Sequence, residues 1–226
     1  MRKWNELPQD MQVEEVRKYY EILQKHKVGM IAKRIFDILV SGNLIVLTSP
    51  ILLILSILIK LDSRGPVIFR QVRITTYGKK FRICKFRTMV NNAEKLGTQV
   101  TTKGDARVTR MGKLLRGCRL DELPQLFNIL TGDMTFVGTR PEVEKYVNQY
   151  TNEMKATLLL PAGVTSRASI EYKDEEKLLE DAENADKVYV EKVLPEKMKY
   201  NLQAIEKFSF WEDIKTMCAT VVAVMK

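Results

Sequence analysis

The stretch ILVSGNLIVLTSPILLILSILI, residues 38–59, decides the fold. It carries no charged residue, and a straight helix of that length would span roughly 33 Å, enough to cross a bilayer. Ser49 and Pro50 stand at its middle, where proline removes a backbone donor and crowds the preceding turn. The hydroxyls of Thr48 and Ser49 are placed to satisfy the carbonyl groups that Pro50 leaves free.

Basic residues flank this apolar stretch at both ends. Lys33-Arg34 precede it, and Lys60 and Arg64 follow it. Positive flanks favour the cytoplasmic side, so both flanks are satisfied when both stay there. We therefore expect a re-entrant helix that enters one leaflet, breaks at Ser49-Pro50 and returns. A single span kinked at the proline stays open, because transmembrane helices tolerate proline. Asp37 is expected to pair with one of the two bases before it.

The composition excludes several familiar chemistries. The 226 residues contain a single histidine, His26, and three cysteines without metal-ligand spacing. A Ser-His-Asp or Cys-His mechanism and a structural zinc site are therefore unlikely, and the cysteine usage indicates a reducing compartment. Catalysis would have to come from carboxylates, basic side chains, hydroxyls or backbone, with or without a hard metal ion.

The net charge of +9 is concentrated in one region. Residues 60–119 hold 16 Lys and Arg residues and three acids. Such a surface faces anions, and nucleic acid, anionic lipid and phosphorylated substrates all fit. A solvated basic face without a specific ligand is the alternative. Aromatic residues lie among these bases, but no nucleic-acid-binding module is recognisable, so we expect no nucleic-acid partner.

The remaining pattern predicts an α+β fold that is mainly helical. We expect a re-entrant membrane helix-break-helix packed on interfacial amphipathic helices, together with a small β-hairpin. The expected parts are an N-terminal amphipathic helix (1–30), the membrane hairpin (31–60) and a catalytic domain on the cytoplasmic face (61–226). Within them, periodicity and turn residues predict strands over Val67–Ile74 and Phe81–Phe86 and helices over 7–28, 108–119, 120–130, 141–158, 171–186 and 194–210.

Residues 108–119 form the strongest of these patterns. Apolar residues gather on one side of the predicted helix, and a base recurs at every third position on another. This is the pattern of a helix that lies on a membrane surface. An ordinary surface helix on a core is the alternative, but the neighbouring apolar stretch favours the membrane.

Asp121-Glu122 follows the basic region directly. Pro124 fits only the first turn of the next helix, so the two acids stand at or near a helix start. Acids there are often simple caps. The functional alternative is a carboxylate that attacks a phosphate, with a magnesium ion held by one carboxylate and by substrate phosphates. The bases available to bind phosphate are Lys85, Arg87, Arg107, Arg116 and Arg140.

Six segments together resemble the bacterial sugar transferases, the monotopic polyprenyl-phosphate phosphoglycosyl transferases. The resemblance covers about residues 31–215. The segments, in order, are Lys33-Arg34-Ile35-Phe36-Asp37, Gly65-Pro66-Val67-Ile68-Phe69-Arg70-Gln71, Lys85-Phe86-Arg87-Thr88-Met89, Asp105-Ala106-Arg107-Val108-Thr109, Leu120-Asp121-Glu122-Leu123-Pro124-Gln125-Leu126 and Val137-Gly138-Thr139-Arg140-Pro141-Glu142.

The resemblance implies an enzyme on the cytoplasmic face of the bacterial inner membrane, inserted in one leaflet. It would move a sugar-1-phosphate from a UDP-sugar to polyprenyl (undecaprenyl) phosphate, release UMP, and so start a surface glycan such as capsule or exopolysaccharide. The resemblance makes Asp121 the nucleophile and Glu122 its partner, with Mg²⁺ as cofactor held by this pair. It also makes Lys85, Arg87, Arg116 and Arg140 phosphate-binding residues, and Ser49-Pro50 the helix break.

The sequence departs from the family pattern at two places. Thr139 stands where the family usually has the first proline of Pro-Arg-Pro. A Pro-Gly-[Ile/Leu]-Thr-Gly-type segment carries an inserted Ala162, and Ser166 replaces its second glycine. A different class of function also fits the charge and the apolar stretch: a non-catalytic membrane-anchored basic adaptor that binds anionic lipid or a partner protein, with Asp121-Glu122 as caps.

Overall fold

The computed structural model describes residues 1–91, 93, 105–172 and 185–225. It is mostly helical, with two small two-stranded sheets. The helix predicted over 171–186 falls largely on residues 173–184, which lie outside the described residues.

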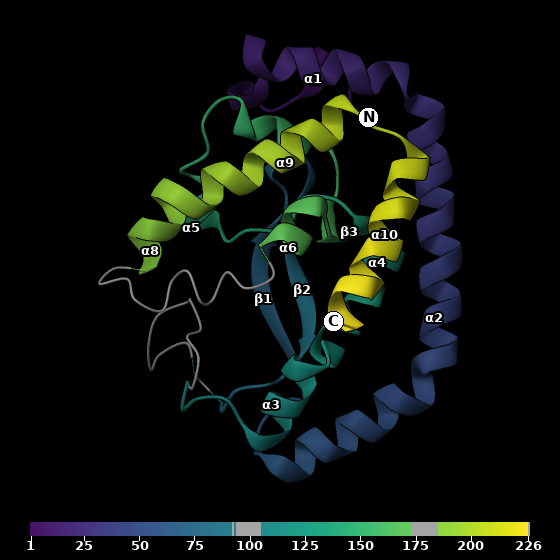
Figure 1. Cartoon of the computed structure of the whole chain (residues 1–226), viewed down its shortest axis with the longest axis vertical. Helices are drawn as coiled ribbons and strands as arrows, with labels where there is room; N and C mark the ends of the chain where they lie inside the picture. The colour runs from purple at the N-terminus through teal and green to yellow at the C-terminus, as the bar shows by residue number, and fades with distance from the viewer. Residues whose placement is uncertain (92, 94–104, 173–184, 226) are drawn as a thin grey trace.

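The N-terminal segment is less helical than predicted. Two short 3-10 turns, η1 (Trp4–Glu6) and η2 (Gln9–Met11), precede α1 (Glu14–Lys25). The helix starts late because Pro8 and the 3-10 turn η2 occupy the first third of the predicted range. The buried side of α1, which includes Val16 and Leu23, packs against α9, at the top of Figure 1.

The helix α2 (Lys27–Asp62) runs through the whole apolar stretch. It is one continuous helix of 36 residues with Pro50 inside it, and Figure 1 shows a pronounced bend along it. The predicted helix break is therefore corrected to a bend. Ser49 Oγ donates to the Val46 carbonyl at 2.8 Å, and Thr48 Oγ1 donates to the Leu44 carbonyl at 2.7 Å. The Ser49 bond satisfies the carbonyl that Pro50 cannot reach, which lets the helix continue.

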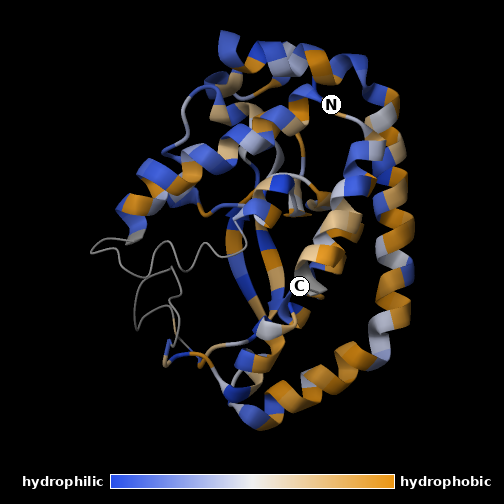
Figure 2. Cartoon of the chain, viewed as in Figure 1, coloured by the Kyte–Doolittle hydropathy of each residue, from blue (hydrophilic) through white to orange (hydrophobic). Residues whose placement is uncertain are grey.

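Much of the surface of α2 is apolar and uncovered. Figure 2 shows its second half almost wholly hydrophobic. Within the described residues it is the one helix long and apolar enough to cross a membrane. A continuous apolar face of this size is rare on soluble monomers, so α2 fits a membrane-associated helix. Its exposed large residues beyond the middle are Val46, Leu47, Ile51, Leu53, Ile54, Ile57, Leu58 and Leu61.

The predicted hairpin is confirmed. β1 (Ile68–Ile74) pairs antiparallel with β2 (Lys80–Phe86), with Ile68 opposite Phe86. The turn η3 (Thr76–Gly78) joins them, and Gly78 adopts a positive φ of 75°, which glycine tolerates. On β2, Phe81 and Ile83 face a core that includes Leu126 and Ile129 of α4.

A second sheet was not predicted. β3 (Met134–Val137) pairs parallel with β4 (Ala162–Thr165). Just beyond β3 the two backbones approach so closely that a Cβ on Gly163 would lie 2.2 Å from the Gly138 nitrogen. Only glycine fits there, so Gly138 and Gly163 hold the start of the 138–142 loop against β4.

The basic helix and the segment after it are largely as predicted. The N-cap of α3 (Arg110–Gly117) is Thr109, whose Oγ1 accepts from the Gly112 nitrogen at 3.0 Å. The 3-10 turn η5 (Leu120–Glu122) and α4 (Gln125–Thr131) replace the single helix expected over 120–130. Asp121 and Glu122 therefore belong to a tight turn ahead of α4.

The prediction of a helix over 141–158 is wrong. Its place is taken by α5 (Glu144–Val147), an irregular stretch and the 3-10 helix η6 (Met154–Leu159). The residues between them, Asn148-Gln149-Tyr150-Thr151-Asn152, are mostly weak helix formers. α6 (Arg167–Glu171), α8 (Ala185–Val188), a π-helical turn η7 (Tyr189–Val193), α9 (Leu194–Glu206) and α10 (Phe210–Met225) follow; α10 contacts α2, and the two lie side by side in Figure 1.

We predict that Gly112→Ala destabilises the protein whereas Gly117→Ala does not. Both glycines lie in α3, but a Cβ on Gly112 would lie 2.0 Å from the Thr88 carbonyl oxygen, and one on Gly117 would meet open space. Overpacking costs about 1–3 kcal/mol, so the melting temperature of Gly112→Ala should fall by about 5 °C. Gly117→Ala should match the wild type or exceed it, because alanine favours helix. Thermal melts of the detergent-purified proteins followed by circular dichroism measure this, and equal melting temperatures for the two variants would contradict the close packing of α3.

Candidate active site

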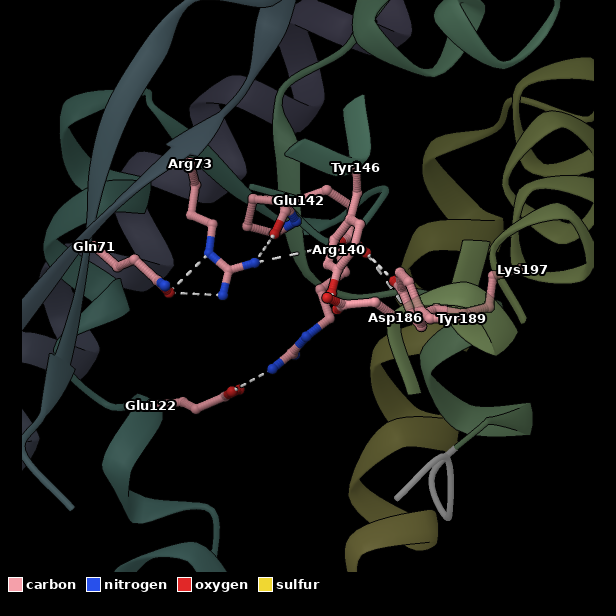
Figure 3. Close-up of polar contacts among 10 residues, drawn as sticks. Gln71, Arg73, Glu122, Arg140, Glu142, Tyr146, Asp186, Tyr189 and Lys197 are labelled. Atoms are coloured by element: carbon pink, nitrogen blue, oxygen red, sulfur yellow. Dashed lines mark hydrogen bonds and ion pairs between the residues drawn. The ribbon is translucent and has the colours of Figure 1, made fainter. Parts of the chain in front are cut away.

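Three segments bring the acidic pair and two of the predicted bases together. β2 carries Lys85, η5 carries Asp121 and Glu122, and the 138–142 loop carries Arg140. Lys85 Nζ lies 2.7 Å from Glu122 Oε1, and Arg140 Nη2 lies 2.8 Å from the same oxygen. Figure 3 shows the Arg140 guanidinium pointing at Glu122. One carboxylate oxygen therefore holds two cations from distant parts of the chain.

The buried side chain of Asn128 sets α4 against β2. Its Nδ2 donates to the Arg82 carbonyl at 2.9 Å, and its Oδ1 accepts from the Cys84 nitrogen at 2.8 Å. The amide is thus satisfied away from water by the backbone of one strand. This two-point contact aligns the turn before α4 with Lys85, the next residue along β2.

The two acids of the pair differ in their electrostatics. Burial would raise the pKa of Glu122, but the charges of Arg140 and Lys85 outweigh burial and hold this pKa well below its usual range. Burial in turn lowers the pKa of Lys85, and the Glu122 charge opposes that shift. Glu122 is therefore a fixed anion between two cations.

Asp121 is buried without such partners. Its side chain makes no hydrogen bond or ion pair with the other residues that the structure describes. Burial raises the pKa of Asp121 above its usual value; the Lys85 charge lowers it and the Glu122 charge raises it further. The residue before the turn, Arg119, adopts a left-handed φ of 56°, and Leu120 follows. A strained backbone of this kind is common next to functional residues.

Arg116 and Arg107 make other polar contacts than those of Lys85 and Arg140. Arg116 Nε donates to Thr88 Oγ1 at 3.0 Å, and its charge lowers the pKa of Asp121, although burial and Glu122 outweigh that effect. Arg107 Nη2 lies 2.6 Å from Asp105 Oδ2. Hydrogen bonds from the Arg107 side chain are the main reason that the pKa of Asp105 is lowered to about 2. The charge of Arg116 thus acts on both Asp105 and Asp121 and lowers the pKa of each.

Arg87 contacts a different element from the other predicted bases. Its Nη2 donates to the carbonyl oxygens of Ser63 at 2.6 Å and Ile59 at 3.3 Å, and its Nη1 donates to the Pro66 carbonyl. These carbonyls lie at the end of α2 and just after it, where a helix leaves acceptors unsatisfied. The contacts seen here are therefore to the exit of α2, and phosphate binding by Arg87 stays a prediction.

A polar group behind Arg140 was not predicted from the sequence. Glu142, Arg73 and Tyr189 meet in the interior, as Figure 3 shows, and Lys197 and Gln71 extend the group at its two ends. Glu142 belonged to a motif segment, but nothing in the spacing of the chain connects it with Tyr189.

The acidic pair fits a magnesium ion that arrives with a phosphorylated substrate. Mg²⁺ is usually bound by one or two carboxylates together with substrate phosphates and water. Among the residues that the structure describes, Asp121 has no ion pair to displace, and the two ion pairs of Glu122 fall on Oε1. No group of three or more His, Cys, Asp or Glu side chains that could hold a metal occurs within the described part of the chain. Within that part, the acidic pair can supply one or two ligands to a metal ion.

Comparison with known proteins gives the family. The model of the bacterial sugar transferase family matches residues 28–226. The chain is 38% identical over 192 residues to a UDP-N-acetylgalactosamine-undecaprenyl-phosphate N-acetylgalactosaminephosphotransferase of Aeromonas hydrophila, covering 84% of this chain and 42% of that protein. It is also 38% identical over 200 residues to a UDP-glucose:undecaprenyl-phosphate glucose-1-phosphate transferase of Klebsiella pneumoniae, covering 86% of this chain and 40% of that protein.

A third relative is matched over less of this chain but over more of its own length. The chain is 43% identical over 122 residues to a putative undecaprenyl-phosphate N-acetylgalactosaminyl 1-phosphate transferase of Bacillus subtilis, covering 54% of this chain and 68% of that protein. The chain spans about two fifths of the length of the first two relatives. With nearly all of its length matched by the family model, and with the acidic pair and its bases assembled in one place, the chain belongs to the bacterial sugar transferase family.

Proposed function

We propose that the protein transfers a sugar-1-phosphate from a UDP-sugar to polyprenyl phosphate, with release of UMP, and that this reaction begins the assembly of a bacterial surface glycan. The printed names of the relatives describe this reaction with undecaprenyl phosphate as acceptor. The observation that carries the proposal is the buried Asp121, which has no side-chain partner among the described residues and stands beside Glu122, which Lys85 and Arg140 fix in place.

In the first half-reaction, an Asp121 carboxylate oxygen attacks the phosphorus that bears the sugar. The bond from this phosphorus to the bridging oxygen breaks, and UMP leaves with the electron pair. Lys85 has N–H groups beyond the one given to Glu122, and these can donate to the phosphate oxygens, while the positive charge of Arg140 stabilises the charge that develops there. Burial strengthens these interactions, because few water molecules compete for the same groups.

In the second half-reaction, a phosphate oxygen of the polyprenyl phosphate attacks the same phosphorus. The Asp121–phosphorus bond breaks, the carboxylate is regenerated and the product is a polyprenyl diphosphate sugar. A covalent intermediate lets a water-soluble donor and a lipid acceptor use one site in turn. Mg²⁺, bound by Asp121 and Glu122 with the diphosphate, would supply charge neutralisation on the transferred group.

We further propose that α2 is re-entrant and that the protein lies on the cytoplasmic face of the inner membrane. The two ends of α2 contact the same body: Arg34 donates to the Ile129 and Leu130 carbonyls of α4, and Ile59 packs with Phe86 and Leu115. Contacts from both ends of α2 to one body support a topology with both ends on one side of the bilayer. The bend in α2 and the bases at both flanks support this topology.

The covalent intermediate predicts a burst without acceptor. Mixed with a suitable UDP-sugar alone, the protein should release about one UMP per molecule and gain the mass of the phosphosugar on the peptide that contains Asp121. Asp121→Asn should release none, whereas Asp133→Asn, which changes an acid paired with Lys79 on the surface, should behave as the wild type. EDTA should abolish the burst and added Mg²⁺ restore it. UMP release by Asp121→Asn equal to that of the wild type would contradict the role of Asp121 as nucleophile. If neither protein released UMP from any of a broad panel of UDP-sugars, the adaptor would be the better explanation.

The electrostatics of the pair predict the acid limit of the reaction. Asp121 must be ionised to attack, and its pKa is raised, so UMP release should fall with decreasing pH before an ordinary aspartate would protonate. Glu122→Gln removes a charge that raises the pKa of Asp121 and should move this limb to lower pH. Lys85→Met removes a charge that lowers it and should move the limb to higher pH. Single-turnover rates of UMP release against pH measure both shifts, and a common direction would contradict the assignment.

The topology predicts the labelling of cysteines on either side of α2. A cysteine placed at Lys3 and the native, exposed Cys218 should both resist a membrane-impermeant maleimide in spheroplasts and both react after the membrane is permeabilised. Cys118→Ser serves as the background, because that residue is exposed as well. Labelling of only one of the two positions before permeabilisation would identify a single span.

A further inference from the structure

The 138–142 loop carries Arg140 and is held from two sides by the backbone. The Gly138 nitrogen donates to the Thr165 carbonyl at 2.9 Å, and the Gly163 nitrogen donates to the Thr139 carbonyl at 2.8 Å. At the other end of the loop, the Ile74 nitrogen of β1 donates to the Glu142 carbonyl at 3.0 Å. Arg140 therefore projects from a segment that is clamped between β4 and β1.

The Glu142 carboxylate adds a side-chain anchor to this clamp. It is 7% exposed and accepts from the Tyr189 hydroxyl at 2.5 Å. Lys197 Nζ lies 4.0 Å from the same Glu142 oxygen and donates to the Tyr189 oxygen at 3.3 Å. Arg73 lies 3.9 Å from the second Glu142 oxygen and donates to the Pro141 carbonyl at 3.1 Å. Figure 3 shows these groups converging directly behind Arg140.

The charges of this group explain why the anchor matters for Arg140. Burial lowers the pKa of Arg73; Glu142 opposes that shift, and the nearby charge of Arg140 adds to it. Two arginines thus lie close together, and each needs its own anion: Arg73 has Glu142, and Arg140 has Glu122. Without Glu142 fixed in place, Arg73 would compete for the same acceptors as Arg140. A buried charge network of this kind is better suited to fixing geometry than to adding stability.

Tyr189 reaches Glu142 because of a local irregularity in its helix. It opens the π-helical turn η7, which continues directly into α9. Pro195 stands in the first turn of α9 and lacks the N–H that would bond the Glu191 carbonyl of a regular helix. Single π-helical turns inside helices are frequent at functional sites. The turn therefore places a hydroxyl from the C-terminal part of the chain against the loop of the active site.

We propose that Glu142, Tyr189 and Lys197 form a positioning network that fixes the Arg140 guanidinium against Glu122 and so against the donor phosphates. The three are positioning residues, since they act through Arg140 and contact neither Asp121 nor Glu122 among the described residues. This inference rests on the proposed function for its effect on turnover, but its effect on the contact between Arg140 and Glu122 is independent of the reaction.

Two neighbouring tyrosines provide a matched test. The rings of Tyr146 and Tyr189 lie 4.7 Å apart in one core cluster, and each hydroxyl donates to one acid, Asp186 for Tyr146 and Glu142 for Tyr189. Tyr189→Phe should lower kcat for UMP release about tenfold with little change in KM. Tyr146→Phe should stay within about twofold of the wild type, because its hydroxyl donates to Asp186, which lies outside the 138–142 loop.

A second arm tests whether Tyr189 acts through Arg140. In an Arg140→Lys background, Tyr189→Phe should add no further loss, because the group that it positions is already gone. A full additional tenfold loss in that background, or equal losses for Tyr189→Phe and Tyr146→Phe, would overturn the proposal while leaving the proposed function standing.

A third arm needs no activity. The melting-temperature changes of Arg140→Gln and Glu122→Gln should be non-additive in the otherwise wild-type protein, because the two residues are in contact, and should become additive when Tyr189→Phe is present. Unchanged non-additivity would overturn the positioning role. If the wild type released no UMP from a broad panel of UDP-sugars, the proposed function would fail, and this arm would still decide the network.

Discussion

The rest of the structure depends on the contacts that hold the first half of α2 to β3 and α4. Asp37, 3% exposed, accepts from the Thr135 hydroxyl at 2.7 Å and from the Phe136 nitrogen at 3.3 Å rather than pairing with the bases before it as predicted. Arg34 donates to two carbonyls near the end of α4, where the helix dipole favours a cation. Since α4 follows the acidic pair directly, these contacts fix the position of α2 relative to Asp121 and Glu122.

The acidic pair shows how two adjacent carboxylates acquire different properties. Both are buried, and burial alone would favour the neutral form of each. Glu122 escapes this because two cations share one of its oxygens, whereas no side chain in the described structure bonds to Asp121. Environments that push the pKa values of two neighbouring acids apart are a common way to divide roles between them. These environments suit the roles proposed above, with Asp121 as the nucleophile and the fixed Glu122 as its partner.

The parts of the fold that depend on local patterns were predictable from the sequence. The hairpin of β1 and β2 follows from two β-rich runs around Gly78, and the basic face of α3 follows from its periodicity. The sheet of β3 and β4 was not predictable, because its four-residue strands are distant in sequence and meet through two glycines that carry no hydrophobic pattern. A break of α2 was predicted at Ser49-Pro50, but the Ser49 hydroxyl bonds the Val46 carbonyl and the helix is continuous.

In the candidate site, too, the local motif was predictable from the sequence and the contacts between distant segments were not. Asp121-Glu122 and the bases around it were recognisable as a motif, but the motif could not distinguish Lys85, which contacts Glu122, from Arg87, which contacts the carbonyls at the exit of α2. Both come from the same strand end, two residues apart. Part of the positive charge in residues 60–119 therefore has a structural role, because Arg87 fastens the end of α2. Because Lys85 and Arg87 are so close along the chain, the exit of α2 and the acidic pair are fixed relative to each other by one short segment of backbone.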